Sequence, residues 1–497
     1  MTTRHVIYNF AAFFLLAGTF AATSEADPFV IGPRPPTLGE IGHWTSALKG
    51  TDHAKALSAA KEVAASGWSG GCALLLDFYR TGEPENRLAA VQSLAALGGS
   101  DSADALVAIA LNDRSPRVRQ AASDGVKLVV GANPALQRFQ AAADDAQHAT
   151  PLMRGRAIHS AARVNPDRAA GLLCSLLAND DPTLACAAAE ELAYVPSWPS
   201  VDGLMQHLDP QSEARAEVRQ ACGAALERLT GKTFAFDLTQ WSAWRTEVRS
   251  RGEDRSPEPF TYVPVTKHVP VDVVVAFDTT GSFLHAWADL SHPLEGVLRA
   301  IRKLEPDARF GLIRYRAVSP EMTLKYTLWP TPLTYDLEQI QREMDRAAFG
   351  GGSGALHEAL RFALSEMAWR EHARRILVVI GDDEPQSPVE DAFAAALKTA
   401  QEASQFDTLQ INTIFTFTSA SLQHGFPSDI SPYMHGGSPP NPLRAVYERL
   451  ALAGNGRFYE FHRGFKNLID RNAEKIDLRV GEQPEETARK WLTPVRK

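Results

Sequence analysis

Oxygen-bearing side chains gather in three glycine-containing segments of the C-terminal half of the chain. Carboxylates and hydroxyls form a hard donor set, which suits Mg²⁺, or alternatively Mn²⁺ or Ca²⁺, and does not suit zinc. In a tight turn, residues two apart can point the same way, so Asp278, Thr280 and Ser282 can converge on one ion. The three segments are Asp278-Thr279-Thr280-Gly281-Ser282, the glycine-rich residues 350–354 with Ser353, and Gly381-Asp382-Asp383-Glu384-Pro385.

The surrounding sequence predicts an α/β domain that would bring these segments together. Val271–Phe277 and Ile376–Ile380 are β-branched, largely apolar runs, as expected of strands buried on both faces of a sheet. Alternating strands and helices predict a mostly parallel, doubly wound sheet, and its strand carboxyl ends meet at one edge, where Asp278 and Asp382 fall. The other predicted strands are 309–315, 323–329 (an edge strand that ends at Pro330), 409–417 and 456–461, and the predicted helices are 294–304, 356–369, 389–403 and 443–452.

The same residues resemble a von Willebrand factor type A (VWA) domain with its metal-ion-dependent adhesion site. That site has an Asp-x-Ser-x-Ser turn, a Thr or Asp in a glycine-rich loop, and an Asp after a later strand. Asp278, Ser282 and Asp382 match directly, and Thr280 keeps the hydroxyl of a Ser. Ser353 takes the Thr or Asp position, although the loop spacing is short. The resemblance implies a Rossmann-like fold, Mg²⁺ as the best-suited ion, and a protein partner that offers an acidic side chain to it.

A second interpretation of this pattern stays open. Ser282 can be a helix cap and Asp382 a turn residue, with the metal site lost. The chain would then be a structural scaffold that acts through its helical region. The sequence has no nucleophile elbow, His-Glu-x-x-His motif, phosphate loop or dinucleotide fingerprint, and no evident general base, so we expect a binding protein and not an enzyme.

The sequence of residues 46–249 predicts an all-α region with internal repetition. The four residues Val-Arg-Gln-Ala open a helix at 118–121 and again at 218–221, each time after a turn that contains Asp and Pro. Because one helix pair leaves an apolar face open, neighbouring pairs must stack to bury it. The units resemble HEAT repeats, which implies a solenoid with an extended protein-binding surface. The residues that carry this resemblance are Asp113, Pro116, Val118, Arg119, Ala121 and Ala122.

Aromatic and sulfur side chains in the helical region are best explained by packing. Trp241 and Trp244 are three residues apart, on one helical face, and are expected to cap the core of the last repeat. The cysteines lie in Ala/Leu-rich surroundings without zinc or redox spacing and are expected to be small buried hydrophobes. Export would make a Cys174–Cys186 disulfide conceivable. The four cysteines are Cys72, Cys174, Cys186 and Cys222.

The N-terminus reads as an export signal. Arg4 and His5 precede the short apolar run Phe10–Ala22, which suits a cleaved signal peptide, although an uncleaved anchor is the alternative. We therefore expect a periplasmic, secreted or cell-surface protein without a membrane span in the mature chain. The expected organisation is a signal peptide at 1–26, an extended lead-in at 27–45, HEAT-like repeats at 46–249, a linker at 250–268, the VWA-like domain at 269–475 and a C-terminal tail at 476–497.

Composition narrows the class of partner. The chain carries 51 Lys and Arg against 59 Asp and Glu, a net charge of −8, and it has no basic block. A nucleic-acid partner is therefore not expected, because it requires a clustered basic face. The long segment 418–442 follows a predicted strand and should emerge beside the metal, where it would shape partner choice unless it is a disordered insertion. Its His424 and His435 are potential metal ligands, although lone loop histidines usually are not.

Overall fold

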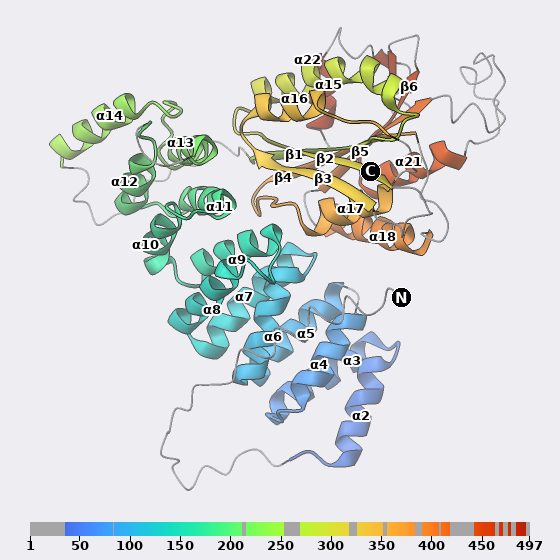
Figure 1. Cartoon of the computed structure of the whole chain (residues 1–497). Helices are drawn as coiled ribbons and strands as arrows, with labels where there is room; N and C mark the ends of the chain where they lie inside the picture. The colour runs from blue at the N-terminus through green and yellow to red at the C-terminus, as the bar shows by residue number, and fades with distance from the viewer. Residues whose placement is uncertain are drawn as a thin grey trace.

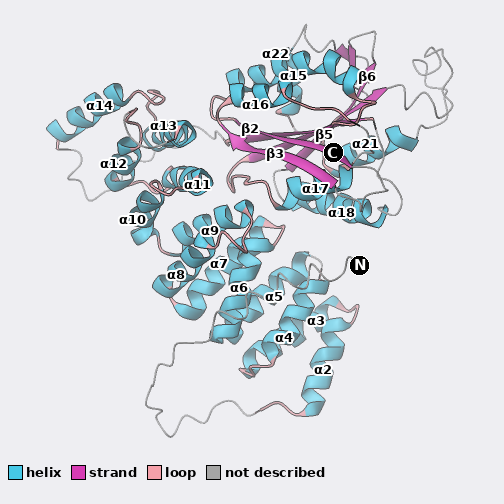
Figure 2. Ribbon diagram, viewed as in Figure 1, coloured by secondary structure: helices cyan, strands magenta, loops and turns pink. Residues whose placement is uncertain are grey.

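The computed structural model describes residues 35–82, 84–210, 215–252, 269–317, 326–350, 355–382, 390–406, 409–417, 442–462, 467–470, 476–478 and 484–493. The predicted signal peptide, most of the linker, Ser353 and nearly all of the segment 418–442 lie outside these residues. A helical array and an α/β domain lie side by side (Figures 1 and 2). Within the described part of the chain, no helix is both long and apolar enough to span a membrane.

The helical array consists of pairs that stack along a curve (Figure 1). The predicted turn at residues 113–116 separates α6 from α7. Asp113 accepts the backbone N–H of Ser115 at 2.7 Å, and Arg119 donates to the carbonyl oxygen of Asp113 at 2.8 Å. The turn thus satisfies its own polar groups, while Val118 is buried in the core. The helices are α2 (Leu38–Lys49), α3 (His53–Ser66), α4 (Gly71–Thr81), α5 (Pro84–Leu97), α6 (Gly99–Asn112), α7 (Pro116–Val130), α8 (Ala132–Asp144), α9 (Pro151–Val164), α10 (Pro166–Leu176), α11 (Pro182–Leu192), α12 (Trp198–Gln206), α13 (Ala216–Thr230) and α14 (Leu238–Ser250).

The array begins earlier than the sequence analysis placed it. Part of the expected extended lead-in at 27–45 is helical, because α2 starts at Leu38. The cause is a capping box: the Thr37 hydroxyl accepts the N–H of Glu40 at 3.2 Å, and the Glu40 carboxylate accepts the N–H of Thr37 at 2.7 Å. A Thr followed three residues later by a Glu is a sequence signal for the start of a helix, as at Thr37 and Glu40. The neighbouring prolines and glycine favoured an extended segment in the sequence analysis instead.

The far end of the array is closed by the expected aromatic pair. Trp241 is fully buried, and its ring lies 5.7 Å from that of Trp244 in an edge-to-face arrangement. The Trp241 indole donates a hydrogen bond to the carbonyl oxygen of Ala235 at 2.9 Å. The prediction that these indoles cap the last repeat is confirmed.

All four cysteines are free. Cys72, Cys186 and Cys222 are buried, as expected of small hydrophobes, and burial raises the pKa of each thiol. Cys174 is only partly buried, and its thiol lies 3.5 Å from the carbonyl oxygen of Pro199. The conceivable Cys174–Cys186 disulfide is therefore not formed.

The α/β domain is built on one mixed sheet in the order β3-β2-β1-β4-β5-β6-β7-β8. The neighbours β2, β1, β4, β5 and β6 run parallel, and β3, β7 and β8 pair antiparallel at the two ends. The order reverses at β1, which confirms the doubly wound prediction. The strands are β1 (Val271–Asp278), β2 (Arg309–Ala317), β3 (Tyr326–Thr334), β4 (Arg374–Gly381), β5 (Leu409–Phe417), β6 (Phe458–His462), β7 (Asn467–Asp470) and β8 (Ile476–Leu478).

Helices cover both faces of this sheet, as a buried parallel sheet requires (Figure 1). The helices form two groups of three. One group packs on the apolar side chains of one face of the sheet, and the other group packs on those of the opposite face. The first group is α15 (Leu284–Leu304), α16 (Leu337–Asp345) and α22 (Pro484–Trp491), and the second is α17 (Leu356–Ser365), α18 (Glu390–Phe406) and α21 (Pro442–Ala453).

Several elements differ from the prediction because tertiary contacts decide them. Strand β3 continues through Pro330, where the sequence analysis ended it. An edge strand pairs on one side only and tolerates a residue without an N–H. Helix α15 begins ten residues before the predicted 294, α17 ends at Ser365 instead of 369, and α16 and β7 were not predicted.

The predicted C-terminal tail at 476–497 is also part of the domain. It supplies β8 to the sheet, and α22 packs against α15. Ala488 and Trp491 are almost completely buried in that contact. A short segment with two apolar residues has no visible core face until its partner helix is in place, so the sequence did not reveal this packing.

Candidate functional site

The two predicted carboxylate ligands lie at neighbouring strand ends. Strands β1 and β4 are parallel, with Phe277 opposite Ile380, so Asp278 and Asp382 follow at the same edge of the sheet. Both are buried, with 0% and 2% of their surface exposed. A Cβ placed on Gly381 would lie 3.4 Å from the Cβ of Asp278, which shows how closely the two strand ends approach.

The turn after β1 aligns two of the three predicted hydroxyl ligands, Thr280 and Ser282. The backbone N–H of Thr280 donates to Oδ1 of Asp278 at 2.7 Å, and the hydroxyls of Thr280 and Ser282 lie 3.1 Å apart. Two adjacent ligands of an octahedral Mg²⁺, each about 2.1 Å from the ion, are about 3.0 Å apart. The spacing of these hydroxyls therefore fits a magnesium ion.

Ser282 does not act as a helix cap here. Helix α15 has Phe283 at its N-cap position, without a side-chain cap bond. The Ser282 hydroxyl instead contacts that of Thr280. The alternative interpretation of Ser282 as a helix cap is therefore not supported by the structure.

The glycine-rich loop starts beside this turn. Gly350 forms a parallel bridge with Thr280, and its N–H donates to the carbonyl oxygen of Thr279 at 3.1 Å. Ser353 lies three residues further on, outside the described residues. The structure thus brings four of the five predicted ligands to one edge of the sheet and places the start of the loop that carries the fifth next to them.

Two tyrosines, Tyr315 of β2 and Tyr447 of α21, pack against the strand ends that carry the carboxylates. The Tyr315 hydroxyl donates to the carbonyl oxygen of Ile380 at 3.2 Å. Burial raises the pKa of Tyr315 well above its usual value, and the nearby Tyr447, Asp278 and Asp382 raise it further. The phenol therefore stays neutral at physiological pH and adds no charge of its own to this edge.

Gly381 is required by this packing. A Cβ at that position would lie 2.4 Å from the Tyr447 hydroxyl oxygen and 2.9 Å from that of Tyr315. No side chain fits there without displacing a tyrosine that supports the two strand ends.

An arginine borders the same edge. The Arg316 guanidinium lies over the Trp329 ring, 5.1 Å from its centroid. Its Nη1 lies 2.2 Å from the position that a Cβ on Gly350 would take. This places a fixed positive charge beside the start of the glycine-rich loop, where the resemblance predicted no residue of interest.

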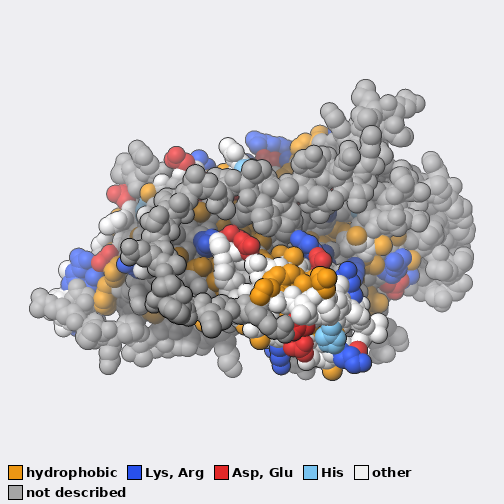
Figure 3. All heavy atoms as spheres, turned by 90° about the horizontal axis from the view of Figure 1, so that it is seen from below, with side chains coloured by type: hydrophobic (Ala, Val, Ile, Leu, Met, Phe, Trp, Pro, Cys, Tyr) orange, Lys and Arg blue, Asp and Glu red, His pale blue; other side chains and the backbone are white. Residues whose placement is uncertain are grey.

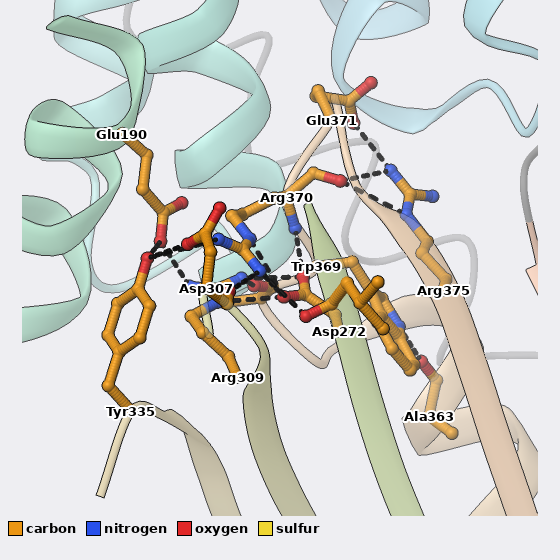
Figure 4. Close-up of polar contacts among 12 residues, drawn as sticks. Glu190, Asp272, Asp307, Arg309, Tyr335, Ala363, Trp369, Arg370, Glu371 and Arg375 are labelled. Atoms are coloured by element: carbon orange, nitrogen blue, oxygen red, sulfur yellow. Dashed lines mark hydrogen bonds and ion pairs between the residues drawn. The ribbon is translucent and has the colours of Figure 1, made fainter. Parts of the chain in front are cut away.

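The opposite edge of the sheet holds a buried charge network that the sequence analysis missed (Figure 4). Asp272, at the start of β1, is fully buried and accepts hydrogen bonds from Arg309 at 2.8 and 3.0 Å and from the side chain and backbone of Arg370 at 2.9 and 2.8 Å. Burial opposes its charge, but the two guanidiniums lower the pKa of Asp272 below its usual value. The signal was a lone Asp inside the otherwise apolar run Val271–Phe277.

This network continues into the helical array and joins the two regions. Glu190 of α11 lies 3.0 Å from Arg309 and accepts a hydrogen bond from the Tyr335 hydroxyl at 3.4 Å. Arg228 of α13 pairs with Asp307. Helices α9, α11 and α13 face the α/β domain in Figure 1, which agrees with these contacts.

A second part of the interface is formed around Glu371, which precedes β4. Its carboxylate accepts hydrogen bonds from Arg119 at 2.6 Å and Arg156 at 3.1 Å, and Arg375 lies 3.5 Å away. Burial opposes ionisation, but these three arginines hold the pKa of Glu371 well below its usual range. Apolar packing accompanies the charges, because Leu152 of α9 joins the core of the α/β domain.

Comparison with known proteins supports the assignment of the helical region. Residues 41–127 match the family model of HEAT repeats. Over these residues the array consists of HEAT repeats, and the stacked helices from α8 to α14 extend it. No curated protein matches this chain.

Solved structures that are similar to part of this chain include a VWA domain, a von Willebrand factor type A protein and a pilus adhesin. The SpRpn10 VWA domain is 11% identical with a TM-score of 0.27, and the match covers 39% of this chain and 89% of that one. A von Willebrand factor type A protein from Catenulispora acidiphila is 11% identical with a TM-score of 0.29, covering 45% and 43%. The pilus adhesin SpaC from Lactobacillus rhamnosus GG is 12% identical with a TM-score of 0.31, covering 46% and 30%. These TM-scores are too low to support the fold assignment. The doubly wound assignment rests on the strand order of this chain.

Proposed function

We propose that this chain is an exported, non-enzymatic binding protein. Its VWA-like domain would engage a protein partner through Mg²⁺ held by Asp278, Thr280, Ser282 and Asp382, with a further ligand from Ser353. The HEAT-repeat solenoid would provide a second interaction surface. Export is inferred from the apolar run Phe10–Ala22.

The observation that carries this proposal is the convergence of oxygen donors at one sheet edge. Two carboxylates leave a divalent ion without excess negative charge around it, so water and an acidic side chain of the partner can complete its coordination. The ion would supply a positive charge that binds the partner's carboxylate. The Arg316 guanidinium lies beside Gly350 and would provide a second positive charge, with which the partner's carboxylate can form an ion pair.

The metal-binding part is tested with the full-length chain and Mn²⁺ as a paramagnetic substitute for Mg²⁺. Electron paramagnetic resonance measures free Mn²⁺ during titration of the wild type, Asp278→Asn and Asp382→Asn. We expect one site that Mg²⁺ competes for, and at least about 10-fold weaker binding in both variants. Asp345→Asn is the matched control, because Asp345 is exposed on α16 in the same domain.

Wild-type affinity in both ligand variants, with circular dichroism unchanged, would contradict the metal site. The partner step is tested by capture from the native envelope fraction with Mg²⁺ or with a chelator. A partner that is retained with the chelator and by Asp382→Asn would favour the alternative function, a scaffold that acts through the HEAT repeats.

Electrostatics of the surface agree with a protein partner. On the described part of the face seen in Figure 3, acidic and basic side chains are interspersed and no single charge dominates. On this described face such a mixture offers no extended attraction to a polyanion, and the net charge of −8 does not favour one either.

A further inference from the structure

Two histidines and a glutamate from both regions of the chain meet at the interface between them. His159 lies on α9, Glu191 lies on α11, and His372 lies between α17 and β4. The Nδ1 atom of His159 is 3.2 Å from both carboxylate oxygens of Glu191, and Nε2 of His372 is 3.5 Å from Oε2. All three ligating atoms lie within 4.8 Å of one another.

This donor set differs in kind from that at the opposite edge. Two imidazole nitrogens and one carboxylate are typical ligands of zinc, whereas the β1 edge offers only oxygens. Two ligands of a tetrahedral zinc, each about 2.0–2.1 Å from the ion, are about 3.4 Å apart. The distances from the Glu191 carboxylate to the nitrogen atoms of His159 and His372, 3.2 and 3.5 Å, are already close to this value. Zinc binding therefore requires only that the two imidazole nitrogens move closer to each other.

The surrounding side chains hold the imidazoles in place. The Tyr194 ring lies against that of His372, with 4.0 Å between the centroids, and the His159 ring meets the edge of His372 at 4.8 Å. Nε2 of His372 is buried and faces the Glu191 carboxylate. Glu191 is buried, so its carboxylate faces the two rings and not bulk solvent.

We propose that His159, Glu191 and His372 form a zinc site that clamps the HEAT-repeat solenoid to the VWA-like domain. Three protein ligands leave a fourth position for water or for a side chain of a partner. Because two ligands come from the solenoid and one from the α/β domain, zinc can bind with full affinity only when the two regions are docked. Zinc would therefore stabilise the docked arrangement by mass action.

The test is a zinc titration of chelator-treated full-length protein in excess Mg²⁺, against a chromophoric chelator. We expect one zinc per chain. His159→Gln and His372→Gln should each weaken it by about 100-fold or more, since loss of a supporting partner alone costs 10–100-fold. His148→Gln is the matched control, because His148 pairs with Asp145 on the solenoid surface. Asp382→Asn should retain the zinc, which separates this site from the proposed magnesium site.

X-ray absorption on the zinc-loaded wild type does not depend on the folding of any variant. Two imidazole nitrogens and a carboxylate oxygen in the first shell support the proposal. The proposal is overturned if the wild type binds no zinc, which would mean that the contacts among these three side chains are structural only. It is equally overturned if both glutamine variants, with normal circular dichroism, bind zinc like the wild type.

Discussion

The carboxylate of Glu371 offers the sharpest test of how the two regions are held together. Replacement by glutamine keeps the size of the side chain and removes its charge. Arg119 and Arg156, which donate to it from α7 and α9, would then lose their acidic partner in a buried setting. Only 8% of the Glu371 side chain is exposed, and 5% and 9% of the two arginine side chains.

The expected cost follows from this burial. Removing one partner of a buried ion pair costs about 3–5 kcal/mol, because the remaining charge is left without compensation. The amide oxygen of glutamine can still accept one hydrogen bond, so we expect about 3 kcal/mol. With a urea dependence of about 3 kcal/mol/M, the unfolding midpoint of the interface-dependent transition should fall by about 1 M.

Urea unfolding followed by tryptophan fluorescence and circular dichroism measures this shift. Glu247→Gln is the control, because its partner Arg251 is 3.7 Å away and both side chains are more than half exposed. That exposed pair should contribute less than about 0.5 kcal/mol. If the midpoint of Glu371→Gln moves no more than that of Glu247→Gln, the charges are not buried together and the described docking is incorrect.

Three further outcomes are expected. The pKa of Asp272 is lowered from 3.8 by Arg309 and Arg370 despite burial, so its contribution to stability is full above about pH 5 and is lost as the pH falls below about 4. The acid side of a plot of unfolding free energy against pH should accordingly be flatter in Asp272→Asn. Trp491→Ala should lower the unfolding free energy by about 3–5 kcal/mol, and a change below about 1 kcal/mol would show that α22 does not belong to the core. Thr150→Ala, which removes the side-chain cap of α9, should cost about 1 kcal/mol in thermal unfolding, and an unchanged midpoint would argue against that cap.

Features that depend on neighbours in the sequence were predictable. Helical periodicity and the repeated Val-Arg-Gln-Ala segments gave the solenoid, and β-branched runs gave the central strands. The turn from Asp278 to Ser282 could be placed at a strand end because its residues are adjacent, and parallel topology then brought Asp382 to the same edge. The predicted coordination of an ion by these residues, and any contribution of Ser353, remain predictions.

Features that depend on how distant segments dock were decided by the tertiary structure alone. Arg119 and Glu371 are 252 residues apart, and neither carries a local signal of its partner. His159, Glu191 and His372 come together only because α9 and α11 pack against the end of the sheet. The physical reason is that periodicity records which face of an element is buried, whereas the partner of a buried charge is set by the relative placement of whole elements.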